Sequence, residues 1–324
     1  EYVKMLVDEI RNCPDTVQNY RVISVFFGGG TPSLLTGEQI GRLMDTVREI
    51  FTLDEDAEIT MEMNPGTVTE EKLRKYRQAG VNRLSIGLQS VNDEELRLLG
   101  RIHTYEEFRE AYHLARVNGF SNINVDLISA IPGQTVESWR RTLERVMALS
   151  PEHISAYSLI LEEGTTFYKK YVEDKAKEGP KLPDEDAERQ MYWDTETLME
   201  KNGYHRYEIS NYAKEGYACR HNLGYWERIP YLGFGIGAAS LVPGDLIGKC
   251  RKLEGKMSRY TNPDQLREYA HYYRNKFQAE LLTEIEEMEE FMFLGLRKMN
   301  GISKKEFLEY FGKSLEDIYG EPIC

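Results

Sequence analysis

Three polar side chains stand within or directly after apolar runs, where a buried strand would present them to a ligand. Glu62 precedes Asn64 and Pro65, Gln89 follows the run RLSIGL, and Asp126 lies within NINVDLISAIPGQ. A carboxylate or amide in such a run must find hydrogen-bonding partners, because removal from water is otherwise costly. Each residue alone could serve as a helix cap or in a loop hydrogen bond. Three together favour the binding of a polar ligand.

A glycine-rich turn and an arginine extend this set. The run VISVFF ends in Gly28, Gly29, Gly30 and Thr31, whose backbone a ligand can approach without meeting a Cβ. The turn matches neither the GxGxxG nor the GxxxxGKS/T phosphate loop, so an ordinary turn remains the alternative. Arg101 could offer its planar guanidinium to a carboxylate, although a solvated surface arginine is the more common case.

An aromatic segment surrounds a single histidine, His221. The segment reads RHNLGYW and is followed by the glycine-rich run YLGFGIGAA at 231–239. Imidazole is a common ligand of iron, but a histidine flanked by aromatic residues is often a packed core residue, so spacing alone leaves both open. Tyr157 and Tyr207 could line a cavity, with aromatic packing as the alternative.

Short β-rich runs alternate with helical runs from residue 20 to 160, which is the pattern of a parallel sheet with crossover helices. Strands are predicted at residues 21–27, 58–62, 83–87, 122–128 and 153–158. Helices are predicted between them from apolar spacing and from the capping pairs Thr36/Gln39, Thr67/Glu70 and Thr104/Glu107. Ligands of such sheets bind at the carboxyl ends of the strands, where Glu62, Gln89 and Asp126 fall.

The pattern changes beyond residue 160. Residues 162–190 are rich in Glu, Lys, Gly and Pro and indicate a surface excursion, which leads into a helix at 184–202. Residues 264–278 and 284–319 are predicted to be mainly helical. We therefore expect two domains, a β/α core over 1–213 and a small C-terminal domain over 214–324.

The composition excludes several classes of protein. The chain has 41 Lys and Arg against 54 Asp and Glu, so its net charge of -13 predicts no general attraction to nucleic acid or to an anionic membrane. No run approaches the roughly 20 apolar residues that span a bilayer, and we expect a cytoplasmic protein. The 4 cysteines, Cys13, Cys219, Cys250 and Cys324, are scattered and predicted to be reduced thiols.

Five motifs, in order, resemble those of the HemN-like radical S-adenosylmethionine (SAM) family. They are GGGTPSLL, the ExNP of Glu62 to Pro65, RLSIGLQS, the arginine twelve residues beyond Gln89, and NVDLISAIPGQT. The resemblance implies an α/β fold, a partial (β/α)6 radical SAM barrel to which the predicted strands contribute the second to the sixth, plus a small, mainly helical C-terminal domain. It also implies that the first strand and a cluster loop with a Cx3Cx2C motif precede Glu1, so that the cysteine ligands of the 4Fe-4S cluster are not in this chain.

In that family the residues at these positions bind SAM. The resemblance implies the following contacts: Gly28, Gly29, Gly30 and Thr31 for the methionyl ammonium, Glu62 as a SAM-binding acid, Arg101 for the carboxylate, Gln89 and Asp126 for the ribose hydroxyls, and Ile128 and Ile160 beside the adenine. The assignment is physically reasonable, because a cationic fork meets a carboxylate and acceptors meet hydroxyl donors.

The segment HNLGYW resembles the HNxxYW motif of the heme-chaperone (HemW) branch of this family, which implies that His221 is a ligand of heme iron. Many relatives carry a histidine where this chain has Ala239, so no role is transferred there. The implied function is that of a radical SAM protein that binds heme and delivers it to hemoproteins, with SAM and a 4Fe-4S cluster as cofactors. No nucleic acid and at most transient membrane association are expected. The alternatives are an oxygen-independent coproporphyrinogen III oxidase of porphyrin biosynthesis and, third, a radical methylase.

Overall fold

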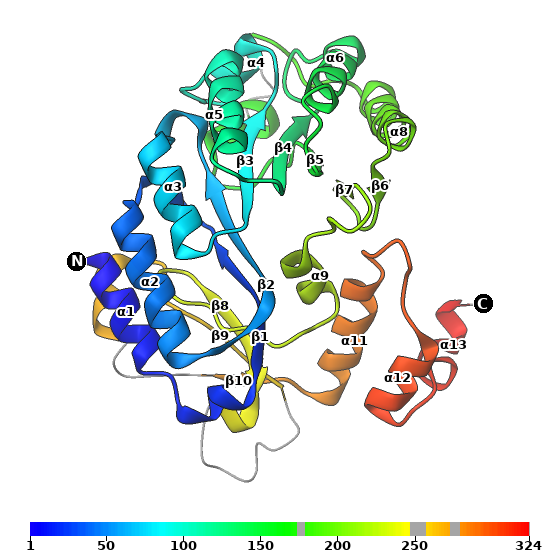
Figure 1. Ribbon diagram of the computed structural model, residues 1–324. Helices are drawn as coiled ribbons and strands as arrows, with labels where there is room; N and C mark the ends of the chain where they lie inside the picture. Colours follow the sequence, from blue (N-terminus) through cyan, green and yellow to red (C-terminus); the bar gives the residue numbers. More distant parts are fainter. Residues whose placement is uncertain (174–178, 247–256, 273–278, 324) are drawn as a thin grey trace. The chain divides into compact units, whose positions relative to one another are not determined.

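The chain forms two compact units, and the computed structural model describes residues 1–173, 179–246, 257–272 and 279–323 (Figure 1). Unit 1 consists of Glu1–Val25, Glu38–Glu58 and Cys219–Cys324, and unit 2 of Phe26–Gly37 and Ile59–Ala218. Strands β1 (Arg21–Phe27) and β2 (Thr52–Met63) run through both. The domain boundary expected after residue 213 stays a prediction. The two compact units each combine several separate stretches of the chain, so they do not test a single boundary in the sequence.

Unit 2 is built on a sheet whose first strands follow the order of the chain. β2 pairs with β3 (Arg83–Gln89), β3 with β4 (Ile123–Ser129), and β4 with β5 (His153–Ser158), each in parallel. At the far edge β7 (Asn211–Ala213) pairs antiparallel with β5, and β6 (His205–Arg206) with β7. The five predicted strands and the partial barrel are confirmed. β2 is longer than expected, since it begins at Thr52, and β6 and β7 were not predicted.

Crossover helices lie on the outer side of these strands (Figure 1). They are α3 (Glu70–Ala79), α4 (Asp93–Leu98), α5 (Tyr105–Val117) and α6 (Val136–Met147). Between β5 and β6 the chain forms α7 (Thr166–Tyr168), its continuation as one π-helical turn (Lys169–Glu173), and α8 (Glu185–Lys201). Single 3-10 turns at Pro32–Leu34 and Pro65–Thr67 follow β1 and β2. The predicted apolar faces are buried: Trp139 and Leu143 of α6 have no exposed surface. α8 packs on α6, and Trp139 Nε1 donates to Thr195 Oγ1 at 2.9 Å.

Two of the predicted capping pairs have different outcomes. The Thr104/Glu107 capping box is present: the Glu107 amide donates to Thr104 Oγ1 at 3.2 Å, and the Thr104 amide to Glu107 Oε2 at 2.7 Å. The Thr67/Glu70 pair is wrong, since Thr69 caps α3 by accepting from the Lys72 amide at 3.3 Å. Pro65 begins a 3-10 turn in which Thr67 Oγ1 donates to the Asn64 carbonyl at 2.8 Å, and this turn delays the helix.

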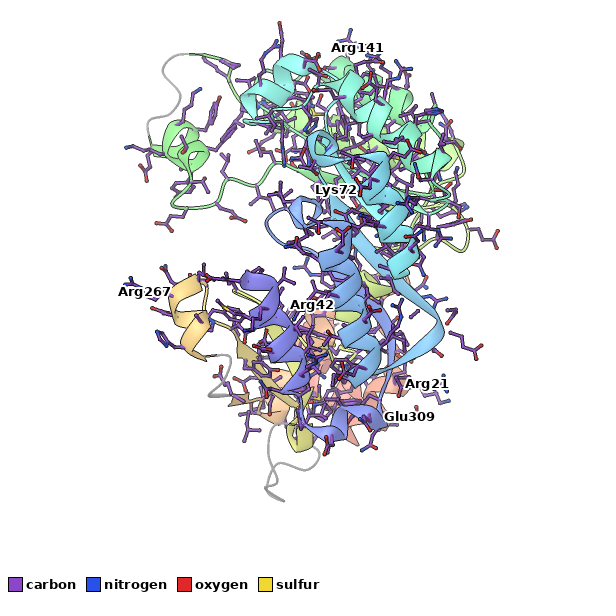
Figure 2. The ribbon with its side chains drawn as sticks, turned by 60° about the vertical axis from the view of Figure 1, so that its left-hand side comes forward. Arg21, Arg42, Lys72, Arg141, Arg267 and Glu309 are labelled. Carbon is purple, nitrogen blue, oxygen red and sulfur yellow. The ribbon has the colours of Figure 1, made fainter. Side chains whose placement is uncertain are left out.

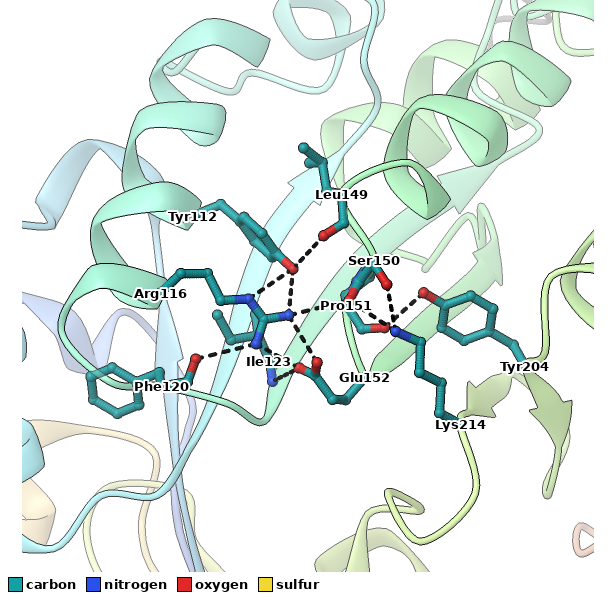
Figure 3. Close-up of polar contacts among 10 residues, drawn as sticks. All are labelled: Tyr112, Arg116, Phe120, Ile123, Leu149, Ser150, Pro151, Glu152, Tyr204 and Lys214. Carbon is teal, nitrogen blue, oxygen red and sulfur yellow. Dashed lines mark hydrogen bonds and ion pairs between the residues drawn. The ribbon is translucent and has the colours of Figure 1, made fainter.

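A charged cluster holds the amino ends of β4 and β5 (Figure 3). Arg116, from the last turn of α5, pairs with Glu152 at 2.8 Å, and Glu152 Oε2 also accepts from the Ile123 amide at 3.0 Å. Tyr112 Oη accepts from Arg116 Nη2 at 2.6 Å and donates to the Leu149 carbonyl at 3.0 Å. The cluster ties the starts of β4 and β5 to α5, the helix that precedes β4. In barrels of parallel strands this end serves stability, whereas ligands bind at the other.

Unit 1 combines the first helices of the chain with its C-terminal part. Its helices are α1 (Tyr2–Arg11), a 3-10 turn at Asp15–Asn19, α2 (Gly37–Ile50), α9 (Arg220–Trp226), a 3-10 turn at Gly244–Leu246, α10 (Leu266–Tyr272), α11 (Glu284–Gly295), α12 (Lys304–Phe311) and α13 (Leu315–Ile323). The helical C-terminal prediction is thereby confirmed, although its part over 273–278 lies outside the described residues. A small antiparallel sheet in the order β10 (Glu280–Leu281), β9 (Met257–Thr261) and β8 (Ala239–Pro243) was not predicted. Phe307 of α12, Met288 and Leu315 form the core of the last helices.

Two further expectations concern the whole chain. Within the described ranges, none of the helices combines the length and the apolar character required to cross a membrane. Among the described residues, Cys13 and Cys219 form no disulfide, in agreement with the predicted thiols. Cys250 and Cys324 lie outside the described residues.

Candidate functional site

The carboxyl ends of β1 and β2 meet through Glu62, whose Oε2 accepts a 3.1 Å hydrogen bond from the amide of Gly29. Gly29 and Gly30 have φ angles of 76° and 57°, which side-chain-bearing residues rarely adopt. A Cβ on Gly28 would lie 2.4 Å from Cε1 of Phe26 and 3.3 Å from the Glu62 carboxyl carbon. The glycines are therefore required for the turn to approach Glu62.

Asp126 of β4 lies close enough to Glu62 for their charges to interact. Burial raises the pKa of the Glu62 carboxyl, and the charge of Asp126 raises it further. Burial also raises the pKa of Asp126, against the hydrogen bond from Asn124, the charge of Arg83 and hydrogen bonds from Ser155 and Ser85. Two partly buried acids at one rim would both be stabilised by a cation or by hydroxyl donors.

Gln89 is held in a strained conformation at the same rim. Its φ of 76° is left-handed, and the β3–β4 register shifts between Gly87 and Gln89. A Cβ on Gly87 would lie 2.9 Å from Gln89 Nε2, so the side-chain amide of Gln89 folds back over Gly87. Gly87 is the residue of β3 that pairs with Asp126 of β4. Such outliers concentrate at functional sites, because the strain must be stabilised by surrounding contacts. The structure thus brings Glu62, Gln89 and Asp126 together.

The residue that holds the loops after β3 and β4 was missed by the sequence analysis. Glu95 of α4 is buried, and its carboxylate accepts hydrogen bonds from Ser90 Oγ at 2.6 Å, from Gln134 Nε2 at 2.9 Å and from Ser138 Oγ. Ser90 directly follows Gln89, and Gln134 ends the motif IPGQ. Glu95 therefore fixes both loops. Its acidic neighbours in the sequence DEEL gave no sign of which carboxylate faces inward.

A second clamp ties the loop after β1 to the loop after β2. Lys72 of α3, labelled in Figure 2, donates to the carbonyls of Ser33 at 2.8 Å and Thr67 at 3.2 Å. The hydroxyls of Ser33 and Thr67 are 2.6 Å apart, and the Asn64 amide donates to Ser33 Oγ at 3.1 Å. Several residues of the motifs GGGTPS and NPGT are thus occupied in fixing the loops that carry Gly28 to Thr31 and Glu62.

Arg101, Ile128 and Ile160 take different places. Arg101 follows α4, and its guanidinium forms no hydrogen bond or ion pair with any residue that the structure describes. Ile128 is partly buried near the carboxyl end of β4, in register with Tyr157 of β5, whose pKa burial raises to about 12. Ile160, beyond the end of β5, is 79% exposed.

His221 belongs to unit 1 and lies in the first turn of α9. Its Nδ1 is 3.1 Å from Ser24 Oγ, and its ring meets Tyr225 edge-on, with centroids 4.9 Å apart. Tyr225 in turn meets Tyr231 at 4.6 Å. The His221 amide donates to Glu58 Oε1 at 3.2 Å. A carboxylate that accepts the first amides of a helix stabilises its start, which fixes the place of the imidazole.

The described residues offer no obvious site for a metal cluster of their own. Across residues 1–173, 179–246, 257–272 and 279–323, no three His, Cys, Asp or Glu side chains are grouped so as to hold a metal ion. The thiol of Cys219 donates to Glu58 Oε1 at 3.3 Å. The described residues therefore do not fit a 4Fe-4S cluster.

Known proteins resemble the chain along nearly its whole length. Models of the radical SAM superfamily and of the HemN C-terminal domain match residues 1–146 and 282–323. The heme chaperone HemW of Bacillus subtilis is 38% identical over 321 residues, 98% of this chain and 81% of that protein. HemW of Haemophilus influenzae is 36% identical over 306 residues, 94% and 76% of the two chains. The solved structure of the radical SAM enzyme coproporphyrinogen III oxidase (HemN) from Escherichia coli has a TM-score of 0.77 at 24% identity, over 99% and 74% of the two chains, and shares the fold.

Proposed function

This chain belongs to the HemW family of radical SAM proteins, and on that premise we propose that it binds heme and delivers it to hemoproteins. The observation that carries the proposal is the setting of His221 on α9. Histidines that ligate metals are oriented by a hydrogen bond to the second ring nitrogen. Ser24 is placed to orient the ring through Nδ1, and His221 would then hold iron through Nε2. The aromatic rings of Tyr225 and Tyr231 beside it suit a flat, apolar macrocycle.

We propose further that the rim of unit 2 binds SAM. The guanidinium of Arg101 suits the carboxylate of SAM, because a charge-assisted, two-pronged hydrogen bond is specific for that geometry. Glu62 and the turn from Gly28 to Thr31 suit the methionyl ammonium, since an acid whose pKa burial raises gains most from a nearby cation. Gln89 and Asp126 suit the ribose hydroxyls, and Ile128 and Ile160 the adenine.

SAM and a 4Fe-4S cluster together supply one-electron chemistry when bound. The described residues do not fit the cluster, so none of them is proposed as its ligand. The protein residues at the rim orient SAM and supply its hydrogen-bonding partners. We propose that the protein acts in the cytoplasm, with hemoproteins as its recipients.

A parallel assay separates this function from that of a coproporphyrinogen III oxidase. Full-length protein, reconstituted without oxygen, is titrated with heme and is separately incubated with coproporphyrinogen III, SAM and a reductant. We expect a heme complex with a Soret band that the His221→Ala variant loses, and no decarboxylation of the porphyrinogen. Conversion of the porphyrinogen without heme binding would reverse the assignment.

A further inference from the structure

A chain of hydrogen bonds crosses the inner face of the unit 2 sheet and ends at Asp126. Asn124 Nδ2 donates to Asp126 Oδ1 at 2.7 Å, and Asn124 Oδ1 is 2.6 Å from His153 Nδ1. His153 Nε2 is 2.8 Å from the hydroxyl of Tyr207. The chain thus links β4 and β5 to Tyr207, which follows β6 in the antiparallel edge of the sheet.

The hydrogen bonds of Asn124 fix the direction of its bond to His153. Asn124 Nδ2 donates to Asp126 and also to Ser85 Oγ at 2.7 Å, and Asn124 Oδ1 accepts from Ser155 Oγ at 3.2 Å. An amide has two N–H donors and two acceptor lone pairs, so the remaining lone pair of Oδ1 must accept from His153 Nδ1–H. His153 is fully buried, and this burial together with the charge of Arg83 holds its pKa well below the ordinary value. The imidazole is therefore neutral, and Tyr207 donates to Nε2.

All the donors consequently point the same way, from Tyr207 through His153 and Asn124 to Asp126. Hydrogen bonds in such a chain polarise one another, so each strengthens the next. Ser85 Oγ adds a 3.2 Å bond to Asp126 Oδ2, so both carboxylate oxygens accept from the protein, and Ser155 is a further hydrogen-bond partner of the carboxylate. These bonds hold the carboxylate in one orientation. Its two oxygens then form a pair of acceptors side by side, and such a pair matches two neighbouring hydroxyls.

We propose that His153, Asn124 and Tyr207 are positioning residues that aim the Asp126 carboxylate at the two ribose hydroxyls of SAM. The inference rests on the proposed binding of SAM at this rim. None of the three touches the ligand in this proposal. Tyr207 lies farthest along the chain from Asp126, so the edge of the sheet influences how firmly SAM is held.

The test uses Tyr207→Phe, which removes one hydroxyl and leaves the ring. Its control is Tyr204→Phe, since the buried Tyr204 likewise uses its hydroxyl in a hydrogen bond, to the Pro151 carbonyl at 2.7 Å and away from Asp126, while Tyr207 is partly buried. Affinities of the full-length proteins for S-adenosylhomocysteine and for its 2′-deoxy analogue are measured by calorimetry. Tyr207→Phe should weaken binding of the first by roughly 3- to 10-fold, as loss of about one hydrogen bond predicts, and binding of the analogue much less. Tyr204→Phe should change neither.

Two outcomes would overturn the relay while leaving the proposed SAM site standing. One is that Tyr207→Phe, like Tyr204→Phe, lowers the unfolding temperature but binds both ligands as the wild type does. The other is a nitrogen NMR spectrum of the unliganded wild type in which His153 carries its proton on Nε2. Failure of the wild type to bind S-adenosylhomocysteine or SAM at all would instead refute the proposed SAM site, and with it the inference.

Discussion

The amide of Gly29 and the carboxylate of Glu62 are joined by a 3.1 Å hydrogen bond that links the loop after β1 to the end of β2. The bond stabilises the carboxylate, yet burial and the charge of Asp126 outweigh it, and the pKa of Glu62 is raised. An ionised Glu62 in this environment lowers the stability of the ligand-free protein. A bound cation or hydrogen-bond donor would compensate for that loss.

Replacing Glu62 by Gln should therefore stabilise the free protein at neutral pH. The pKa of Glu62 in the folded protein lies above its ordinary value of 4.5. Protonated Glu62 therefore contributes fully to the free energy of unfolding below pH 4.5, and this contribution is lost as the pH rises through the pKa of the folded state. The amide oxygen of Gln can still accept from Gly29 without becoming charged. Thermal unfolding of ligand-free protein should show a higher midpoint for Glu62→Gln at pH 7.5 and no difference below pH 4.5. A lower midpoint at pH 7.5 would mean that the ionised carboxylate has a stabilising partner. SAM affinity should fall in the same variant.

Arg101→Ala should weaken SAM binding by more than tenfold. A hydrogen bond to a charged group contributes roughly 1.5–3 kcal/mol, and about 1.4 kcal/mol corresponds to tenfold. Arg97→Ala is the control, because Arg97 lies on the nearby helix α4 and is exposed. Calorimetry on full-length protein should find the control unchanged. Equal affinities for both variants and the wild type would make Arg101 an ordinary surface residue.

His221→Ala should remove or shift the Soret band of the heme complex while SAM affinity is retained, because His221 belongs to unit 1 and the SAM candidates to unit 2. His113→Ala, an exposed position on α5, serves as the control. Ser24→Ala should preserve heme binding but alter the band or weaken the complex, since it removes only the contact to Nδ1. An unaltered spectrum in His221→Ala would move the iron ligand to another residue.

Glu152→Ala should destabilise the protein by about 2–4 kcal/mol, because it leaves the Ile123 amide without its acceptor and the partly buried Arg116 without its counter-ion. The pair is far from the rim residues along both strands, so SAM affinity should not change. Glu309→Ala is the comparison. It breaks the 3.6 Å ion pair between Glu309 and Lys305, whose side chains are 64% and 83% exposed, and should lower the free energy of unfolding by less than about 1 kcal/mol. Chemical denaturation of both variants gives the comparison. Similar losses would show that the cluster in Figure 3 is no stronger than a surface pair.

Gly28→Ala and Gly41→Ala should have opposite effects. A Cβ at Gly28 would lie 2.4 Å from the ring of Phe26, so the turn must shift, and both stability and SAM affinity should fall. A Cβ at Gly41 on α2 meets nothing within 4 Å, and alanine in a helix interior stabilises by roughly 0.5–1 kcal/mol over glycine. Unfolding midpoints of the two variants test the contrast. A stabilised Gly28→Ala would show that the turn tolerates a side chain.

Local interactions explain what the sequence by itself determined. The strands follow from β-branched and apolar runs between turns, and the Thr104/Glu107 box forms within a single helical turn. The rim residues Glu62, Gln89 and Asp126 could be placed together in advance, because parallel strands end at one edge whatever their exact register. The alternating runs likewise predicted a parallel sheet with crossover helices, and the resemblance of five motifs to the HemN-like radical SAM family implied the partial barrel.

Contacts between distant residues decided the rest. Three features depend on partners many residues away, which no local pattern encodes. They are the inward orientation of the Glu95 carboxylate, the left-handed backbone at Gln89, and the chain of hydrogen-bond donors from Tyr207 to Asp126. The short strands β6, β7, β8 and β10 likewise form by pairing rather than by propensity. A hydrogen bond across a sheet joins residues that are close only after folding. The sequence therefore supplied the polar groups of the site, and the tertiary structure decided their protons, directions and partners.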